Sequence, residues 1–561
     1  MVRGHAALMR SGGNYWYVIY LLPLTFLALF YFYPLLAILD IGLRPDGWLD
    51  LSAFLRLLST DYYVGVFLFT LYQAALSTAL TLLLALPCAY VFSRYRFAGK
   101  SLLLSLATLP FVLPTVVVAM AFMSLIGRRG LLNDLLRTLF SLDYTPVQLE
   151  RTLAIVIIVH VFYNFAIALR IMTSFWSAQG MAAEEAARVL GADEWSLWRD
   201  IRLPLIQPAL LSAGALVFMF TFTSFGVVLI LGGIRFATLE VQIYYQTISL
   251  FNLPMAAALS LLQIVAIFAL MTVYTHLQRG LQTAIGSAKT VERPVKSPRE
   301  RFLVWGVVIF IFALLFTPLL ALVARSTLNN GALDMSNYLA LAQSSRGSLL
   351  FIAPIESVAN SLRFALISTG MALAIGMTAS FMIAGRGRFA RFVDPLLMLP
   401  LATSAVTLGF GFVVALDEPP LNLRSSWLII PISHTLVAFP FVVRSVLPSL
   451  RAIPSSVREA AQVLGARPFD LLRTIDLPLL SRGIAVGATF AFTVSMGEFG
   501  ASLFVAQRES VTIPVVIYRL IGDPGLASYR QALAMSVILL LVCASGFVLI
   551  ERLRVAGVGE F

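Results

Sequence analysis

Long apolar runs separated by short polar segments make up most of the chain. About 20 apolar residues are enough for a helix to cross the hydrocarbon region of a membrane. The pattern predicts twelve membrane-spanning helices, near residues 16–39, 66–92, 101–126, 152–175, 209–232, 255–276, 302–325, 359–384, 393–416, 425–447, 481–506 and 531–550. The first run is too long for a cleavable signal peptide, so we expect it to remain as a helix. The sequence therefore predicts an all-α integral membrane fold.

Composition narrows the class of protein further. The 561 residues are 59% hydrophobic and only 12% charged, with a mean hydropathy of +0.90, whereas soluble domains carry roughly 25% charged residues. The net charge of +12 comes from Lys and Arg scattered over many short loops, which is typical of cytoplasmic loops beside anionic lipid. This distribution predicts a multi-pass protein that contacts membrane lipid, binds no nucleic acid and has both termini in the cytoplasm.

Two polar stretches with the same residues at the same spacing interrupt the apolar pattern. Residues 184–204 read EEAARVLGADEWSLWRDIRLP, and residues 458–478, which lie 274 positions later, read REAAQVLGARPFDLLRTIDLP. The same offset aligns His160 with His434, and upstream of them the offset grows to about 290. Such self-similarity indicates an internal duplication. Each copy holds six predicted spans, and because six is even, we expect the two repeats to be parallel.

The expected organisation is a first repeat, a cytoplasmic linker and a second repeat. Their boundaries are expected at residues 1–277, 278–301 and 302–561. The linker contains Lys, Arg, Ser and Pro, a composition typical of a connection outside the membrane. Cys88 and Cys543 lie within predicted spans, and we expect free buried thiols rather than a disulfide.

Each polar stretch is expected to form two short helices outside the membrane. Its Glu-Ala-Ala segment has high helix propensity, and the following glycine, Gly191 or Gly465, would end the first helix in the left-handed conformation. Asp193 as an N-cap and Pro468 at a first helical position would begin the second helix in the two copies. Apolar residues at every third position would form one exposed stripe. The Leu-Pro pair would break the helix before the next span.

The duplicated spacing favours a protein groove as the binding partner of these helices. An apolar stripe alone is also compatible with an interfacial helix that lies on lipid, which is the alternative. The residues expected to contact the partner are Glu185, Ala186, Ala187, Gly191, Trp195, Trp198, Glu459, Ala460, Ala461, Gly465, Phe469 and Leu472.

Both stretches resemble the EAA loop in the membrane-spanning subunits of ABC importers that work with a separate substrate-binding protein. The loops span residues 181–204 and 455–478, and both keep the Glu, the two Ala, the Gly and the Ile-x-Leu-Pro ending. In that family the loop docks into a cleft on a cytoplasmic ATPase subunit. The resemblance implies the type I importer permease architecture, two cytoplasmic ABC ATPase subunits, an extracytoplasmic substrate-binding protein and a place in the bacterial plasma (inner) membrane.

Within this family, fused twelve-span permeases are typical of thiamine and ferric-iron importers. The stretches TSFGVVLILGG at 223–233 and SMGEFGASLF at 495–504 look most like the thiamine type. The resemblance implies ATP-driven import of thiamine or thiamine phosphate by alternating access, with ferric iron as the alternative substrate. It also implies that the outer loops 227–254 and 501–530 meet the binding protein, unless they are mere connectors. A more distant alternative is a secondary transporter, which also has twelve helices in parallel halves.

The sequence contains no motif for catalysis or cofactor binding. The only Gly-Lys-Ser triplet, at residues 99–101, lacks the first glycine of a phosphate-binding loop, because position 94 is Arg94. The four histidines have no metal-ligand spacing. We therefore expect that the chain is not an enzyme and holds no metal or cofactor, and that ATP and Mg²⁺ bind to the partner subunits.

Polar residues inside predicted spans are candidates for the substrate path, because burying them in a membrane is costly. Glu498, expected in the eleventh span, could attract a cationic substrate, and its counterpart in the first repeat is Ser224. The alternative for Glu498 is a structural glutamate that is hydrogen-bonded near the outer interface. Phe225 and Phe499 could add cation–π contacts of about 1 kcal/mol. Hydrogen bonding between helices is the alternative role of the remaining candidates. These are His160, Asn164 and His434.

Overall fold

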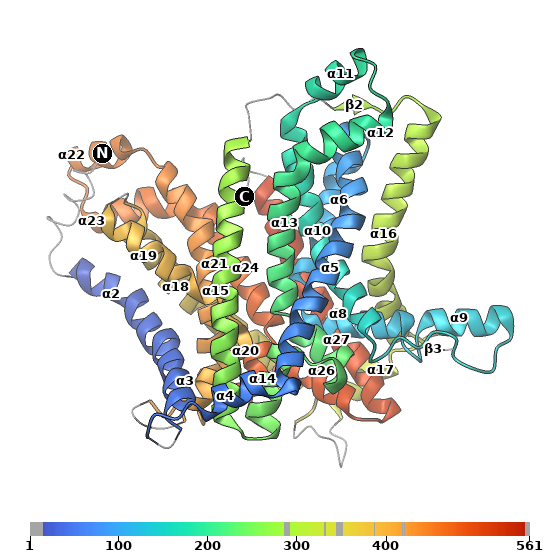
Figure 1. Cartoon of the computed structure of the whole chain (residues 1–561). Coiled ribbons are helices and arrows are strands. Elements are labelled where there is room, and N and C mark those ends of the chain that lie inside the picture. Colours follow the sequence, from blue (N-terminus) through green and yellow to red (C-terminus); the bar gives the residue numbers. More distant parts are fainter. Residues whose placement is uncertain are drawn as a thin grey trace. The chain divides into compact units, whose positions relative to one another are not determined.

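The computed structural model describes residues 15–45, 47–284, 292–329, 332–343, 352–385, 387–417, 419 and 421–555. Helices dominate this part of the chain (Figure 1). Eleven of the described helices are long and apolar enough to span a membrane, and one bent helix pair raises the number to twelve. The predicted all-α membrane fold is confirmed. Residues 1–14 and the linker residues 285–291, on which predictions were made, lie outside the described residues.

The element bounds are as follows. The α-helices are α2 (Tyr15–Leu27), α3 (Tyr33–Leu43), α4 (Ser52–Ser59), α5 (Asp61–Arg94), α6 (Lys100–Ala107), α7 (Leu109–Val112), α8 (Thr115–Ile126), α9 (Leu131–Phe140), α10 (Leu153–Gln179), α11 (Ala182–Val189), α12 (Glu194–Ser196), α13 (Leu203–Phe222), α14 (Leu239–Tyr244), α15 (Leu253–Ala284), α16 (Pro298–Thr327), α17 (Ser336–Leu339), α18 (Glu356–Ile383), α19 (Arg388–Met398), α20 (Ala405–Ala415), α21 (Ile429–Ala452), α22 (Ser455–Val463), α23 (Pro468–Leu471), α24 (Leu477–Gly497), α25 (Gly500–Val505), α26 (Ile513–Gly522) and α27 (Leu526–Val555).

Short π- and 3₁₀-helical turns and two small strand pairs complete the described structure. The turns are η1 (Ala28–Phe32), η2 (Leu197–Arg202), η3 (Val228–Gly232), η4 (Ile234–Phe236), η5 (Tyr245–Ser249), η6 (Ala340–Ala342), η7 (Leu399–Ala402) and η8 (Leu472–Asp476). Strand β1 (Tyr95–Arg96) pairs in parallel with β2 (Arg293–Pro294), and β3 (Leu328–Asn329) pairs antiparallel with β4 (Ala332–Leu333).

The third span of each repeat is interrupted, and that of the second repeat is sharply bent, which the hydropathy pattern did not predict. The predicted helix 101–126 is divided into α6, α7 and α8. The predicted helix 393–416 is divided into α19 and α20, which meet at 91° across η7. Pro114 and Pro400 stand at these interruptions, and proline removes a helical hydrogen bond and disfavours helix at the residue before it. The two continuous helices were therefore wrongly predicted.

The fifth span of each repeat ends earlier than predicted. Helix α13 ends at Phe222 and α24 at Gly497, and in each case a short turn precedes a further buried element, η3 or α25. Glu498 is consequently the residue that follows α24, not part of a continuous span over 481–506. Glycine at and after these breaks weakens the helix. The prediction missed the breaks because hydropathy averaged over a window stays high when the residues on both sides are apolar.

The described helices form two compact units that do not follow the order of the two repeats. The first unit combines Met1–Ala53, Ile243–Ala258 and Met335–Phe561, and the second combines Phe54–Gln242 and Leu259–Asp334. Helix α3 packs against α20 in the first unit, and α16 packs against α8 in the second. The first span of each repeat thus completes the bundle built from the other repeat. The predicted repeat boundaries in the sequence stay a prediction.

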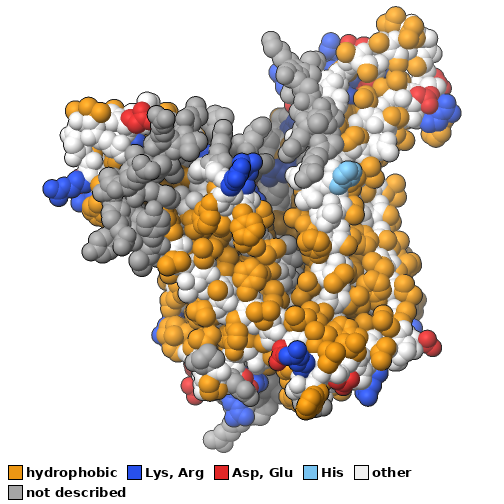
Figure 2. All heavy atoms as spheres, turned by 60° about the vertical axis from the view of Figure 1, so that its left-hand side comes forward, with side chains coloured by type: hydrophobic (Ala, Val, Ile, Leu, Met, Phe, Trp, Pro, Cys, Tyr) orange, Lys and Arg blue, Asp and Glu red, His pale blue; other side chains and the backbone are white. Residues whose placement is uncertain are grey.

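Small residues allow close helix packing in both units. A Cβ at Gly411 on α20 would lie 3.0 Å from the Cβ of Pro34 on α3. Close approach of this kind drives helix association in lipid, where the hydrophobic effect between helices is lost. On the face shown in Figure 2, hydrophobic side chains cover most of the helix sides and charged side chains gather toward the helix ends. Cys88 and Cys543 are free and buried, as predicted.

Candidate functional site

The first part of both polar loops folds as the sequence predicts. Helix α11 ends before Gly191, which has a φ of 88°, and α22 ends before Gly465, which has a φ of 87°. The Ala192 amide donates to the Ala187 carbonyl at 3.0 Å, and the second loop repeats this bond. A left-handed glycine at a helix end avoids the strain that a side chain would cause. Figure 1 shows α11 beyond the ends of α10 and α13.

The second helix of each loop also starts as predicted. The Ser196 amide donates to Asp193 Oδ1 at 2.9 Å, and hydrogen bonds from the Ser196 side chain and amide hold the pKa of Asp193 below its usual value. In the other loop Pro468 is the first residue of α23, and the Arg467 amide donates to Asp470 Oδ2 at 3.1 Å. The N-cap and the N-terminal proline are therefore confirmed.

The Leu-Pro pair at the end of each loop does not break the helix, and that prediction was wrong. Helical structure continues from α12 through η2 into α13, and from α23 through η8 into α24. Both η2 and η8 are π-helical. These wider turns come directly before Pro204 and Pro478, and they accommodate residues that lack an amide hydrogen. The second helix of each loop is therefore a direct extension of the fifth span.

Matched apolar side chains are exposed at the outer end of each loop, and we call them the coupling tips. They are Val189, Leu190 and Trp195, with 88%, 87% and 71% of their surface exposed, and Val463, Leu464 and Phe469, with 88%, 87% and 67% exposed. Val189 and Leu190 were not among the predicted contact residues. The signal for them was the Val-Leu-Gly sequence that both copies share.

The predicted partner-contact residues divide into an exposed set and an internal set. The exposed residues are Glu185, Ala186, Gly191, Trp195, Glu459, Ala460, Gly465 and Phe469, and the half-buried ones are Ala187, Trp198, Ala461 and Leu472. The expectation of one exposed stripe is thus only partly correct, because Trp198 packs against Tyr90 and Trp176 and Leu472 is half-buried. The contact role of the exposed set stays a prediction.

A buried charge network fastens the first loop to its bundle. The Glu184 carboxylate accepts hydrogen bonds from Arg94 at the end of α5 and from Arg202 in η2, with Arg202 Nε 3.1 Å from Glu184 Oε2. Arg94 also donates to the Gly180 carbonyl at 2.5 Å, and Arg202 donates to Glu194 Oε2 at 2.9 Å. The side chains of Arg94, Glu184 and Arg202 are at most 2% exposed. Charges buried this deeply need partners, so the network holds α11 against α5 and η2.

Aromatic rings surround the Arg202 end of this network. The guanidinium carbon of Arg202 lies 4.8 Å from the ring centroid of Tyr90 and 5.0 Å from that of Trp198. Trp176 packs edge-on against Trp198 with centroids 5.9 Å apart. Each cation–π contact contributes about 0.5–2 kcal/mol, more when water is excluded. These contacts explain why Trp198 faces the bundle.

The second loop is fastened by an ion pair of opposite polarity. At the offset of 274, Arg458 takes the place of Glu184 and Asp476 takes the place of Arg202. Arg458 donates from Nε and Nη2 to Asp476 Oδ1 at 2.8 and 2.7 Å. The two side chains are 12% and 10% exposed. Both loops therefore join the same two positions, with the charges exchanged.

His160, a predicted path residue, is buried and hydrogen-bonded between helices. Its Nδ1 lies 3.1 Å from Ser77 Oγ, and its Nε2 lies 2.8 Å from Ser224 Oγ. Asn164 donates from Nδ2 to the His160 carbonyl at 2.9 Å. The structure thus brings Ser224, His160 and Asn164 together where α10 meets the break after α13.

His434 and Glu498 meet at the equivalent break in the second repeat. His434 Nδ1 and Nε2 each lie 2.7 Å from a serine hydroxyl, those of Ser495 and Ser502, and Nε2 lies 3.7 Å from Glu498 Oε2. The two Glu498 oxygens accept hydrogen bonds from the amides of Ala501 and Ser502, both at 3.0 Å. Glu498 therefore satisfies the first amides of α25, which are otherwise unpaired.

The two predicted path phenylalanines follow these breaks and are buried. Phe225 is 7% and Phe499 is 3% exposed, and the Phe499 ring lies 5.5 Å from that of Tyr518. The role of all seven candidates in a substrate path stays a prediction. Among the described residues, no group of three or more His, Cys, Asp or Glu could hold a metal ion.

A further, fully buried carboxylate was missed by the sequence reasoning. Glu240 in α14 and Gln263 in α15 are fully buried, and Gln263 Nε2 donates to Glu240 Oε1. The equivalent positions in the second repeat are Pro514 and Val537. An ionisable residue in this setting is a functional candidate by default. The available signal was a polar pair whose counterparts in the other repeat are apolar.

Comparisons with known proteins agree with this architecture. Residues 81–283 and 370–554 match the family described as binding-protein-dependent transport system inner membrane component. The thiamine transport system permease protein ThiP of Salmonella typhimurium is 29% identical over 508 residues, covering 88% of this chain and 89% of that protein. ThiP of Escherichia coli is 28% identical, with the same shares covered, and ThiP of Haemophilus influenzae is 26% identical over 95% of each chain.

The family model matches each repeat once and more than half of the chain in total. Both matches contain helices that are long and apolar enough to span a membrane, as a multi-pass membrane protein requires. The chain therefore belongs to the binding-protein-dependent inner membrane components, the permease subunits of ABC importers.

Proposed function

We propose that this chain is the fused permease of an importer for thiamine or thiamine phosphate. The observation that carries the proposal is the similarity, along 88–95% of the chain, to permeases whose names specify thiamine transport. The substrate would pass into the cytoplasm by alternating access, as the two repeats open first outward and then inward. Ferric iron is the alternative substrate.

Two cytoplasmic ABC ATPase subunits would each bind one coupling tip. The exposed apolar side chains at the two tips agree within a few per cent in exposure, which supports two equivalent docking sites. A helix that presents apolar residues beside small ones suits a hydrophobic groove, and Ala186 and Ala460 are exposed next to Glu185 and Glu459. ATP and Mg²⁺ would bind to these partners, so that the chain itself hydrolyses no nucleotide.

The continuous helix behind each tip supports a direct mechanical role. Because η2 and η8 join the loops to α13 and α24 without a break, a displacement of the tip would move the fifth span with it. Moving a two-state equilibrium from 1:99 to 99:1 requires a differential binding free energy of about 5.5 kcal/mol. The ATPases would supply this difference by binding the two tips more tightly in one state.

A substrate-binding protein would dock at the other end of the fifth spans. The expected docking loops, 227–254 and 501–530, are largely folded into buried helices such as α14 and α26, but Leu250 and Phe251 are 62% and 77% exposed. With the coupling tips in the cytoplasm, both termini would lie on the same side. The basic loop residues agree with this orientation.

Uptake by the reconstituted complex would test the proposal. Proteoliposomes that contain the chain, its ATPases and its binding protein should import labelled thiamine only when ATP is enclosed with the ATPases. Import that follows a proton gradient without ATP would favour a secondary transporter and overturn the proposal. If ferric iron were imported and thiamine were not, the alternative substrate would hold and the ABC mechanism would stand.

The double variant Glu185→Lys with Glu459→Lys tests the docking step. It should abolish uptake and co-purification of the ATPases while membrane insertion stays normal, because both glutamates are exposed. Glu509→Lys, an exposed glutamate in the loop after α25, is the matched control and should keep the ATPases bound. Normal uptake by the double variant would refute the coupling role.

A further inference from the structure

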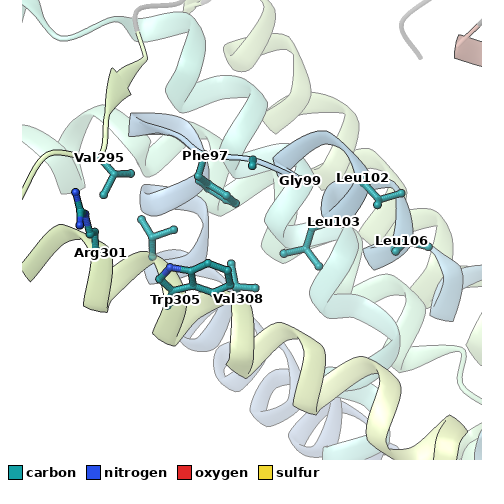
Figure 3. A pocket seen from close by; sticks show the side chains of 11 residues that line it. Phe97, Gly99, Leu102, Leu103, Leu106, Val295, Arg301, Trp305 and Val308 are labelled. Atoms are coloured by element: carbon teal, nitrogen blue, oxygen red, sulfur yellow. The ribbon is translucent and has the colours of Figure 1, made fainter. Parts of the chain in front are cut away.

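A groove of about 380 Å³ lies between α6 and α16 in the second unit. Figure 3 shows Leu103 on α6 directed toward Trp305 and Val308 on α16, and Leu102 and Leu106 also line the groove. Val295, the residue after β2, also lines the groove. Strand β2 pairs with β1, which precedes α6. This pairing holds the chain segment before α16 against the start of α6. Backbone hydrogen bonds within the unit therefore fix the two walls of the groove relative to each other.

The groove runs from a polar end to an apolar end. Arg301, in the first turn of α16, is the only charged residue among the described residues that line it, and it lies at one end (Figure 3). Val308 is seven residues further along the helix, about 10 Å deeper at 1.5 Å per residue. Trp305, between them, is 63% exposed, and tryptophan is enriched at the boundary between headgroups and hydrocarbon. The polar end therefore lies at headgroup depth and the apolar part within the hydrocarbon region.

The charge at the polar end is positive. Arg301 is exposed and forms no ion pair with another described residue, and Lys296 and Arg299 close by are exposed as well. Lys100 is already paired with Glu292, with Nζ 2.7 Å from Oε1. A basic residue at the headgroup level attracts anionic lipid with about 1 kcal/mol. The groove thus offers a positive charge for a phosphate and an apolar channel for a chain attached to it.

We propose that this groove binds one anionic phospholipid. Its phosphate contacts the Arg301 guanidinium, and one acyl chain lies along Leu103 and Leu106 against Trp305. The site is independent of the transported substrate and of the coupling tips. Lipid occupies it because the groove opens to the bilayer, where an apolar recess is filled by hydrocarbon and not by water.

Quenching of Trp305 by brominated lipid tests the proposal. The protein is placed in nanodiscs of phosphatidylcholine that contain a minor fraction of brominated phosphatidylglycerol or of brominated phosphatidylcholine. The difference between the wild-type and Trp305→Phe signals isolates Trp305. We expect about a fivefold preference for the anionic quencher, which corresponds to about 1 kcal/mol. Arg301→Gln should remove the preference.

Arg299→Gln is the matched control, because Arg299 is exposed two residues away but does not line the groove. It should keep the preference. Equal quenching by the two lipids in the wild type would overturn the proposal. An equal loss of the preference in Arg301→Gln and Arg299→Gln would also overturn the proposal, since it would indicate that the general positive charge of the surface attracts the anionic lipid. Loss of the preference on addition of inorganic phosphate would show a free-anion site and would also contradict a lipid site.

Discussion

The two coupling loops present the same outer surface on differently built supports. In the first loop Glu184 lies between Arg94 and Arg202 in a fully buried network. In the second loop a single pair, Arg458 and Asp476, joins the positions of Glu184 and Arg202 with the charges exchanged. The attraction of an ion pair is the same whichever partner is the acid. The comparison teaches that the exposed tip residues are alike in the two loops, whereas the ion pair behind them can have either polarity as long as it joins the same two positions.

The surroundings of the two fastenings differ in the same way. Aromatic rings pack around Arg202 in the first loop, and aliphatic side chains occupy the equivalent positions in the second. At the offset of 274, Trp176 and Trp198 of the first loop's surroundings align with Leu450 and Leu472. Aromatic faces attract a cation, so they suit the loop whose inner charge is an arginine. Where that position is Asp476, the face of a ring would repel the carboxylate.

The largest loss of stability is expected when the charges of the second loop's ion pair are introduced at the equivalent positions of the first loop. Glu184→Arg with Arg202→Asp should fail to restore the fastening, because Arg94 would then face a second buried arginine. An uncompensated buried charge costs about 3–5 kcal/mol. Thermal unfolding in detergent should therefore shift strongly downward. Glu185→Gln, at the exposed neighbouring position, should leave the unfolding midpoint unchanged, and a double variant as stable as the wild type would contradict the three-residue network.

The reciprocal exchange in the second loop should succeed. Asp476→Arg alone places two arginines together and should cost about 1–3 kcal/mol through the lost charged hydrogen bonds. Adding Arg458→Glu should recover most of that loss, because Arg458 has no second buried charge comparable to Arg94 among its described partners. A double-mutant cycle measured by unfolding gives the coupling free energy directly. A coupling near zero would mean that this pair does not fasten the loop.

A smaller effect is expected from exchanging the aromatic surroundings. Trp198→Leu should destabilise the first loop by about 1 kcal/mol beyond its packing loss, because the cation–π contact with Arg202 disappears. Leu472→Trp should bring no matching gain, since the residue at the position of Arg202 is Asp476, whose carboxylate is not attracted to the face of a ring. Unfolding midpoints of the two variants check the difference. An equal gain from Leu472→Trp would show that ring size matters here and charge does not.

Much of the fold and of the coupling loops could be predicted from the sequence, because these features depend on local chemistry. Apolar runs gave the spans, and spacing gave the duplication. The glycine turns and the starts at Asp193 and Pro468 follow from the backbone preferences of single residues. The exchange of charge between Glu184 and Arg458 was also present in the aligned stretches, but its meaning required knowledge that residue 202 lies beside residue 184.

The features that could not be predicted depend on contacts between segments that are distant in sequence or on the backbone hydrogen bonding of a whole helix around a proline. Averaged hydropathy does not reveal the helix interruptions at Pro114 and Pro400. The π-helical turn before Pro204 allows a proline that local rules treat as a helix end. Arg94 meets Glu184 across 90 positions of sequence, and no spacing pattern signals such a pair. In the path region, Glu498 was identified as a candidate, but its hydrogen bonds to the amides of α25 became visible only in the structure.

The smallest expected effect concerns the start of the second helix, where the loops also differ. Hydrogen bonds from Ser196 lower the pKa of Asp193, so its capping stabilises α12 above the usual carboxyl pKa of about 3.9 and is lost as the pH falls through the lowered value. In the second loop the fixed φ of Pro468 does not change with pH. Amide exchange at Ser196 should therefore lose protection in acid, whereas the Asp193→Asn variant should keep it, because an amide oxygen accepts the same bond at any pH. Identical pH profiles for the wild type and this variant would show that the Asp193 carboxylate is not what holds the start of α12, and the contrast between the loops would then rest on their buried ion pairs and on the rings around Arg202.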